Sequence, residues 1–164
     1  MKRFLVAVLM LCTTATVHAA DARNEITAEN VIRLMNAERA AYGLAPLSAD
    51  PRLVQAAGDR MRHMEDEGFW AHQSPDGVNP FTWLRVRAYD FERAGENLAA
   101  GFETVRLLVE SWMESPGHRA NILSPDFADC GIAIIDGSPT GPAAGKSVVV
   151  LFGKKRMSFA STAR

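Results

Sequence analysis

The stretch Ser111-Trp112-Met113-Glu114-Ser115-Pro116-Gly117-His118-Arg119-Ala120-Asn121-Ile122-Leu123 joins two segments that both have helical character. The apolar spacing before it predicts a helix from Glu103 to Glu114, and a Pro-Gly pair interrupts that helix. A second, short helix is expected from His118 to Leu123. The sequence therefore places a titratable imidazole, His118, at the junction of two helices.

Three further helices are expected upstream of this stretch. Thr27 is an N-cap for a helix that reaches Tyr42, with Gly43 as its stop. Asp50-Pro51 starts a second helix that ends at Gly68, and Asn79-Pro80 opens a third that continues to about Ala88. The buried face of the second helix is marked by apolar residues at helical spacing, namely Leu53, Ala57, Met61 and Met64. His63 lies off that stripe and is expected to be solvated.

The C-terminal third has the pattern of strands. Two apolar runs, Gly131 to Asp136 and Ser147 to Gly153, flank a turn-rich loop, which predicts an antiparallel hairpin. A helix-rich front half followed by a strand-rich end predicts an α+β fold, with helices packed on a small antiparallel sheet.

The N-terminal segment has the pattern of a secretory signal. Lys2 and Arg3 precede an apolar run, and Val17-His18-Ala19 fits signal peptidase cleavage after Ala19. The run is shorter than the roughly 20 residues that span a bilayer. Cys12 follows Leu11, where a lipoprotein has a small residue, so lipidation is not favoured. We therefore expect export, to a periplasm or outside the cell.

Charge and cysteine content limit the partners and the covalent chemistry. The whole chain has a formal charge of −1 at pH 7 and loses two basic residues with the signal, which argues against nucleic acid as a partner. Cys130 then stands alone, so no internal disulfide is expected, and its apolar surroundings favour a buried, inert thiol. No heptad pattern suggests an oligomer, and we expect a monomer.

Three polar side chains are candidates for a shared site. His72 and His118 lie at junctions between elements, and Glu96 lies in the Gly95-Glu96-Asn97-Leu98-Ala99 segment, which we also take as a junction. Neutral imidazoles bind metals and take their orientation from carboxylates, so the three could form a metal site or an acid/base site. The alternative is three separate structural residues, because no short metal-binding signature and no nucleophile elbow is present.

Four motifs, in order along the chain, resemble the CAP superfamily (the SCP domain), which groups cysteine-rich secretory proteins, antigen 5 and pathogenesis-related proteins. They are Leu34–Arg39 with Gly43–Leu47, the first histidine motif Phe69–Gly77, the Gly-Glu-Asn motif Gly95–Ala99, and the second histidine motif Trp112–Leu123. The resemblance implies a domain over residues 27–155 with a C-terminal tail, 156–164. It also implies a three-layer α-β-α sandwich with a central antiparallel sheet.

The resemblance further implies that His72, Glu96 and His118 converge on one cleft, where the two histidines hold a divalent metal, commonly zinc. One departure concerns a second cleft glutamate, which animal and plant members have about three residues past the tryptophan. Here Ser115 occupies that position and Glu114 precedes it by one residue, which turns a helical side chain by about 100°.

Three functions are compatible with these features. The first is an exported binding module for a lipid, sterol or envelope component. The second is a zinc-assisted hydrolase or peptidase in which His72 and His118 hold the metal and Glu96 is the general base. The third is a structural or interaction domain with a vestigial cleft. Because one fold carries many activities, the family resemblance does not choose among them.

Overall fold

A computed structural model of the chain describes residues 22–156. The predicted signal segment, Cys12 and the tail beyond Arg156 lie outside these residues. Within the described part, no helix is long and apolar enough to cross a membrane.

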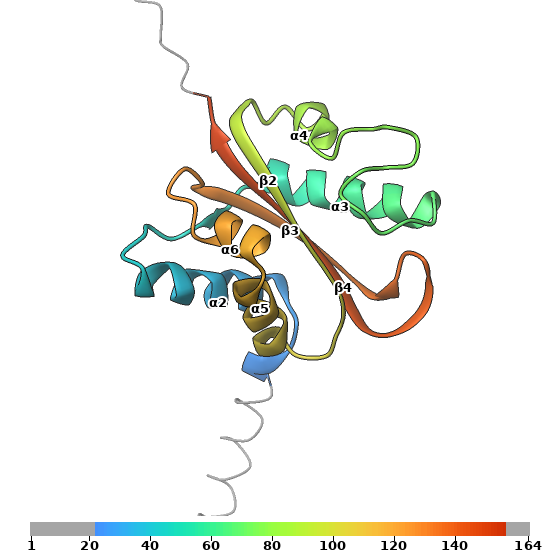
Figure 1. The fold of residues 1–164 in the computed structure, drawn as a ribbon. Helices are drawn as coiled ribbons and strands as arrows, with labels where there is room; N and C mark the ends of the chain where they lie inside the picture. The colour runs from blue at the N-terminus through green and yellow to red at the C-terminus, as the bar shows by residue number, and fades with distance from the viewer. Residues whose placement is uncertain (1–21, 157–164) are drawn as a thin grey trace, which may run out of the picture.

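The described elements run from a helix and a short strand, through two helices, a long strand and two more helices, to a C-terminal hairpin (Figure 1). Their bounds are α2 (Ala28–Ala41), β1 (Ser48–Ala49), α3 (Pro51–Asp66), α4 (Thr82–Val86), β2 (Phe91–Phe102), α5 (Val105–Glu114), α6 (Pro116–Ile122), β3 (Asp129–Ser138) and β4 (Gly141–Lys155). The sheet order is β1-β3-β4-β2. Strands β2, β4 and β3 pair antiparallel, and the two-residue β1 joins β3 in parallel.

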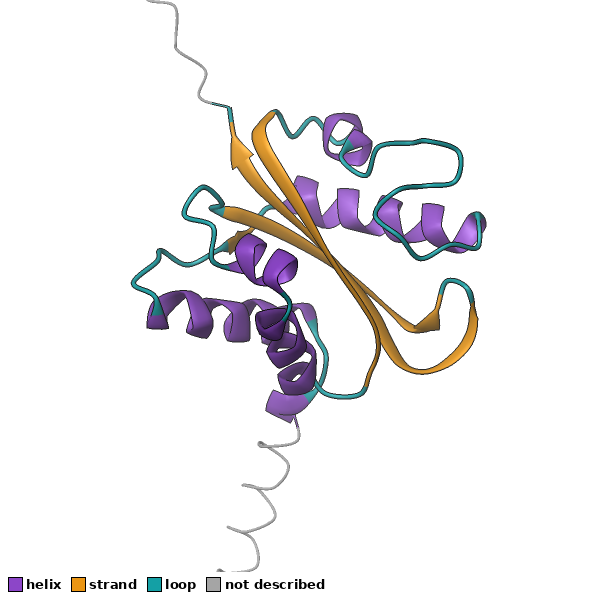
Figure 2. Ribbon diagram, in the orientation of Figure 1, coloured by secondary structure: helices purple, strands orange, loops and turns teal. Residues whose placement is uncertain are grey.

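The predicted three-layer sandwich is confirmed. Helices α2, α5 and α6 cover one face of the sheet, and α3 and α4 cover the other (Figures 1 and 2). Strand β4 lies between two cores and is buried on both faces: Val148, Val150 and Phe152 pack into the first core, and Val149 and Leu151 into the second. This burial explains the unbroken apolar run in β4.

The caps predicted for the first two helices are confirmed. The Thr27 hydroxyl accepts from the Asn30 N–H at the start of α2, and the Asp50 carboxylate accepts from the Arg52 N–H at the start of α3. Both helices end before a glycine of positive φ, Gly43 and Gly68. The predicted hairpin is present, and its strands are longer than the apolar runs that predicted them.

Four expectations were wrong. The third helix spans only Thr82–Val86, because Asn79 binds the Phe81 N–H in a turn that precedes it. The short helix begins at Pro116, so the Pro-Gly pair is its first turn and not a linker. The segment around Glu96 is the interior of strand β2 and not a junction.

The fourth concerns His63, which is not solvated. Its side chain is 11 % exposed, its ring meets the Phe69 ring edge-on at 5.2 Å, and its Nε2 lies 3.3 Å from Asp76 Oδ2. The imidazole thus packs under the loop that follows α3.

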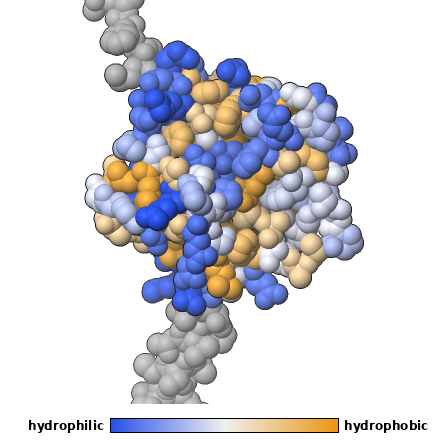
Figure 3. Space-filling model, in the orientation of Figure 1, coloured by the Kyte–Doolittle hydropathy of each residue, from blue (hydrophilic) through white to orange (hydrophobic). Residues whose placement is uncertain are grey.

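The outer surface mixes residue types. The face drawn in Figure 3 carries hydrophilic and hydrophobic residues interspersed, with the hydrophobic ones in small patches.

Candidate functional site

The candidate site lies at the free edge of β2, where both helical layers reach the same strand. Neighbouring residues of a strand face opposite sides. Glu96 therefore faces α3, whose Arg60 it binds, while Asn97 faces α6 and its side-chain amide donates to the His118 carbonyl at 3.1 Å. Both side chains are buried. One dipeptide of an edge strand thus connects the two layers.

The Glu96 carboxylate is engaged at both oxygens. Arg60 Nε donates to Oε2 at 2.9 Å, and His72 Nδ1 lies 2.8 Å from Oε1. The side chains of Arg60 and Glu96 are 0 % and 2 % exposed, so this ion pair is almost fully removed from water. Since a carboxylate paired with a guanidinium accepts hydrogen bonds, His72 Nδ1 carries the proton and Nε2 presents a lone pair.

Arg60 also fixes the backbone that carries His72. Its Nη2 donates to the carbonyls of Ala71 and His72 at 2.7 and 2.9 Å. His72 is therefore held at its backbone by Arg60 and at its ring by Glu96. More than half of the His72 side chain, 55 %, remains exposed.

The two predicted histidines face each other across the site. The ring centroids of His72 and His118 are 6.3 Å apart, and the Trp112 ring lies 6.4 Å from that of His118. The hydrogen bond with Glu96 raises the pKa of His72, whereas burial and then the nearby His72 lower the pKa of His118. As the pH falls, His72 is protonated first and His118 stays neutral longer.

A shallow groove of about 440 Å³ opens beside His72. Its lining combines the edge backbone of β2 with amide side chains, an imidazole and one aromatic ring: His72, Gln73, Asn79, Pro80, Phe81, Ala94, Gly95, Glu96 and Asn121. Asn121 Nδ2 donates to the Glu96 carbonyl and to Asn97 Oδ1, which fixes the wall of the groove next to the edge strand.

The residues present fit a divalent metal only in part. His72 offers Nε2, and burial lowers the pKa of His118, which favours the neutral ring that binds metal. Within residues 22–156, however, no group of three or more His, Cys, Asp or Glu side chains is placed to hold one ion. The pair suits an ion whose remaining positions are filled by solvent, and it does not suit a structural zinc, which takes four protein ligands.

Glu114 and Ser115 lie apart from the histidine groove. Glu114 is exposed and lines two other surface pockets, and Ser115 occupies the joint between α5 and α6 without capping either with its side chain. Cys130 is buried as predicted, and burial raises the pKa of its thiol to about 12.

Three residues that sequence reasoning did not select complete the site: Arg60, Asn97 and Asn121. The signal for Arg60 was present, because it falls at the helical spacing of the buried positions Leu53, Ala57 and Met64. A charged residue on a buried helical stripe needs a buried partner.

Comparison with known proteins assigns the fold and the motifs to one family. Residues 32–151 match the model of the cysteine-rich secretory protein family, CAP. The chain belongs to this family. The CAP assignment confirms the predicted resemblance and covers both histidine motifs and the Gly-Glu-Asn motif.

A relative of this CAP domain occurs in Bacillus subtilis. It is 36 % identical over 123 residues to YkwD of Bacillus subtilis (strain 168), an uncharacterized protein, covering 75 % of this chain and 48 % of YkwD. This chain therefore spans about half the length of that relative.

Two solved structures share the CAP fold. An extracellular protein containing an SCP domain from Bacillus anthracis str. Ames matches with a TM-score of 0.65 and 24 % identity, over 82 % of this chain and 41 % of that one. An outer surface protein of Borrelia burgdorferi matches with a TM-score of 0.66 and 21 % identity, over 80 % of this chain and 98 % of that one. At these identities the likeness concerns the fold.

Proposed function

We propose that this CAP domain is an exported binding module whose groove at the β2 edge takes a polar component of the cell envelope, such as a glycan or a peptide. The observation that carries the proposal is the groove lining. Amide side chains, the half-exposed His72 ring and the Phe81 ring surround an open groove next to a strand edge. Hydrogen-bonding side chains beside an aromatic surface suit sugar hydroxyls or peptide groups.

A lipid or sterol suits this groove less well. Such ligands bury most of their surface in an enclosed apolar cavity. Here the lining is rich in amides and lies open at the molecular surface. Export is supported by the signal-like N-terminal segment and by the names of the two similar structures, which describe extracellular and outer surface proteins.

The test of the groove is binding to purified peptidoglycan fragments by calorimetry. We expect Gln73→Ala and His72→Ala each to weaken binding about tenfold, because each removes a hydrogen-bonding group worth about 1 kcal/mol or more. Gln55→Ala is the matched control, since Gln55 is an exposed glutamine of α3 outside the groove. Binding to phosphatidylglycerol vesicles alone would favour a lipid ligand, and binding unchanged in all three variants would reject the groove.

We also propose that His72 and His118 together bind zinc weakly, with solvent at the other positions. When bound, the ion would supply a Lewis acid at the mouth of the groove. The role of Glu96 is then to orient the His72 ring, and not to act as a general base. Its side chain is 2 % exposed and each of its oxygens already accepts a hydrogen bond, from Arg60 or from His72, so it is poorly placed to activate a water molecule.

A zinc titration by calorimetry tests this pair directly. One-to-one binding is expected in the wild type and is expected to disappear in the His72→Ala/His118→Ala double variant. Equal binding in both proteins would place zinc elsewhere. Cleavage of a peptide library by the wild type that is lost in Glu96→Gln would revive the hydrolase alternative.

A further inference from the structure

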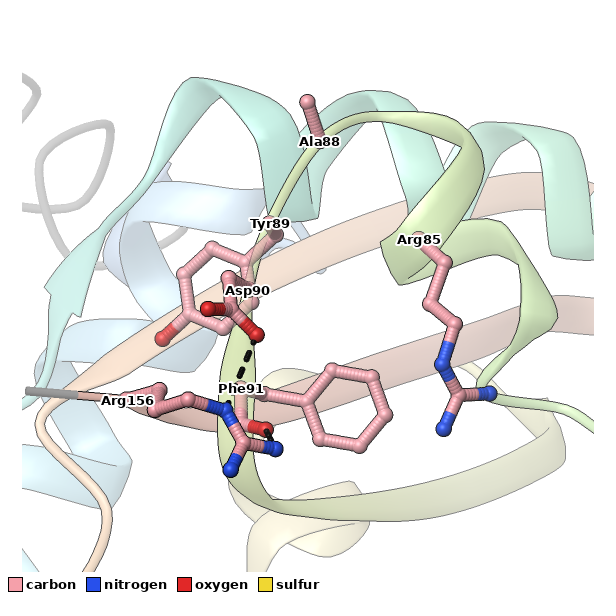
Figure 4. Close-up of a pocket in the computed structure, with 6 residues that line it drawn as sticks. All are labelled: Arg85, Ala88, Tyr89, Asp90, Phe91 and Arg156. Atoms are coloured by element: carbon pink, nitrogen blue, oxygen red, sulfur yellow. Dashed lines mark hydrogen bonds and ion pairs between the residues drawn. The ribbon is translucent and has the colours of Figure 1, made fainter. Parts of the chain in front are cut away.

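Another pocket lies just before the part of β2 that lines the histidine groove. It occupies about 360 Å³ where β2 begins and β4 ends, and its lining is Arg85, Ala88, Tyr89, Asp90, Phe91 and Arg156 (Figure 4). None of these residues lines the histidine groove. The pocket is therefore a separate feature of the molecule.

Arg156 is held in place by its surroundings. Its Nε donates to Asp90 Oδ1 at 3.2 Å and its Nη2 donates to the Phe91 carbonyl at 3.2 Å. These two bonds fix the plane of the guanidinium and use only part of its five N–H donors. Nη1 makes no hydrogen bond within residues 22–156.

Arg85 approaches the same ring from α4. Its guanidinium carbon lies 4.9 Å from the centroid of Phe91, and in the described part of the chain its side chain makes no hydrogen bond or ion pair. Figure 4 shows the Arg85 and Arg156 guanidinium groups on the two sides of the Phe91 ring. Two guanidinium groups thus border one pocket, and contact with the Phe91 ring restrains the group of Arg85.

The charge around the pocket is unbalanced. Asp90 is the only acidic residue in the lining, and it is paired with Arg156. Tyr89 contributes its ring, because its hydroxyl donates to Asp129 at 2.8 Å. Two guanidinium groups against one carboxylate leave a net positive charge in a concave site, which attracts an anion.

We propose that this pocket binds the phosphate group of a phosphorylated ligand. A phosphate is tetrahedral, so its oxygens can accept hydrogen bonds from two guanidinium groups that arrive from different directions. A carboxylate is planar, and one arginine fork satisfies both of its oxygens. The arrangement of two forks around one cavity therefore favours phosphate. This proposal does not depend on the groove at His72.

The test uses the full chain and sodium tripolyphosphate as the probe, titrated by calorimetry at about 0.15 M salt so that diffuse attraction is screened. Arg85→Ala and Arg156→Ala are each expected to weaken binding about tenfold, as expected for the loss of a charge-assisted hydrogen bond. Arg85→Lys should lose part of the affinity, because it keeps the charge and removes the fork. Arg85 makes no hydrogen bond or ion pair within residues 22–156, so its variants remove only the charge at the pocket and the contact with the Phe91 ring.

Arg93→Ala is the matched control. Arg93 is an exposed arginine of β2, the strand that also carries Phe91, and it pairs with Asp126 at 3.1 Å. The proposal stands if only the pocket variants weaken tripolyphosphate binding. An equal loss in Arg93→Ala, or no saturable binding, would overturn it in favour of diffuse attraction. Citrate that binds as tightly as tripolyphosphate, with the same dependence on Arg85, would overturn the choice of phosphate over carboxylate.

Discussion

At the scale of single residues, the site depends on a buried arginine. Arg60 joins three segments: its own helix α3, the loop at Ala71 and His72, and strand β2 through Glu96. It is fully buried, and its Nη1 has no partner in the described part of the chain. Its charge is balanced inside the protein by Glu96, so each of these two residues depends on the other.

Replacing Arg60 by Met is expected to destabilise the fold by about 3–5 kcal/mol, because it leaves the Glu96 charge buried without its partner. The Arg60→Met/Glu96→Gln double variant should recover part of that loss. Urea denaturation gives the free energies of unfolding.

Arg106→Ala serves as the control for this experiment. Arg106 pairs with Glu110 at 3.8 Å on the exposed face of α5, and such surface pairs are worth about 1 kcal/mol or less. A loss in Arg60→Met no larger than the loss in Arg106→Ala would contradict the buried ion pair.

The sequence points to the two histidines and Glu96 as site residues, but it does not point to Arg60. His72 and His118 were selected because few titratable side chains stand at junctions, and the family resemblance then grouped them with Glu96. The partnership of Arg60 and Glu96 joins residues 36 positions apart, and it is set by the packing of α3 on the sheet. Local spacing shows that Arg60 is on a buried stripe but does not identify its partner.

At the scale of elements, helix caps were predicted well, whereas the short strand β1 and the long strand β2 were missed. Caps are local, since Thr27 and Asp50 bind N–H groups two or three residues away. Strand β2 contains two glycines and several polar residues, a composition that is typical of a junction. It forms a strand because it pairs with β4, which lies far along the chain. Strand preference is more dependent on context than helix preference.

The Pro-Gly pair illustrates a different limit of sequence reasoning. Pro116 ends α5 because a helix does not continue through proline, and it also starts α6, since the first helical position has no N–H bond to lose. Pro116 therefore both ends helix α5 and begins helix α6. His118 consequently lies on the first turns of α6, where its carbonyl meets Asn97.

At the scale of the whole molecule, the sandwich depends on how closely α3 approaches the sheet. A Cβ atom added at Gly131 of β3 would lie 2.0 Å from the Leu53 carbonyl carbon and 2.2 Å from its oxygen. Backbone atoms cannot turn aside as a side chain can. Gly131 therefore permits the close contact between β3 and α3. Because α3 carries Arg60, this contact also allows Arg60 to reach Glu96.

Gly131→Ala is expected to destabilise the protein by about 3 kcal/mol or more, because α3 must move away from β3 and the core packed between them must open. Gly58→Ala is the matched control on the facing helix. A Cβ at Gly58 meets nothing within 4 Å, so alanine there should stabilise the fold by about 0.5–1 kcal/mol through its helix preference. Urea denaturation followed by tryptophan fluorescence measures both changes. If Gly131→Ala unfolded at the same urea concentration as the wild type, the close approach of α3 to the sheet would be refuted, and with it the buried placement of Arg60 against Glu96.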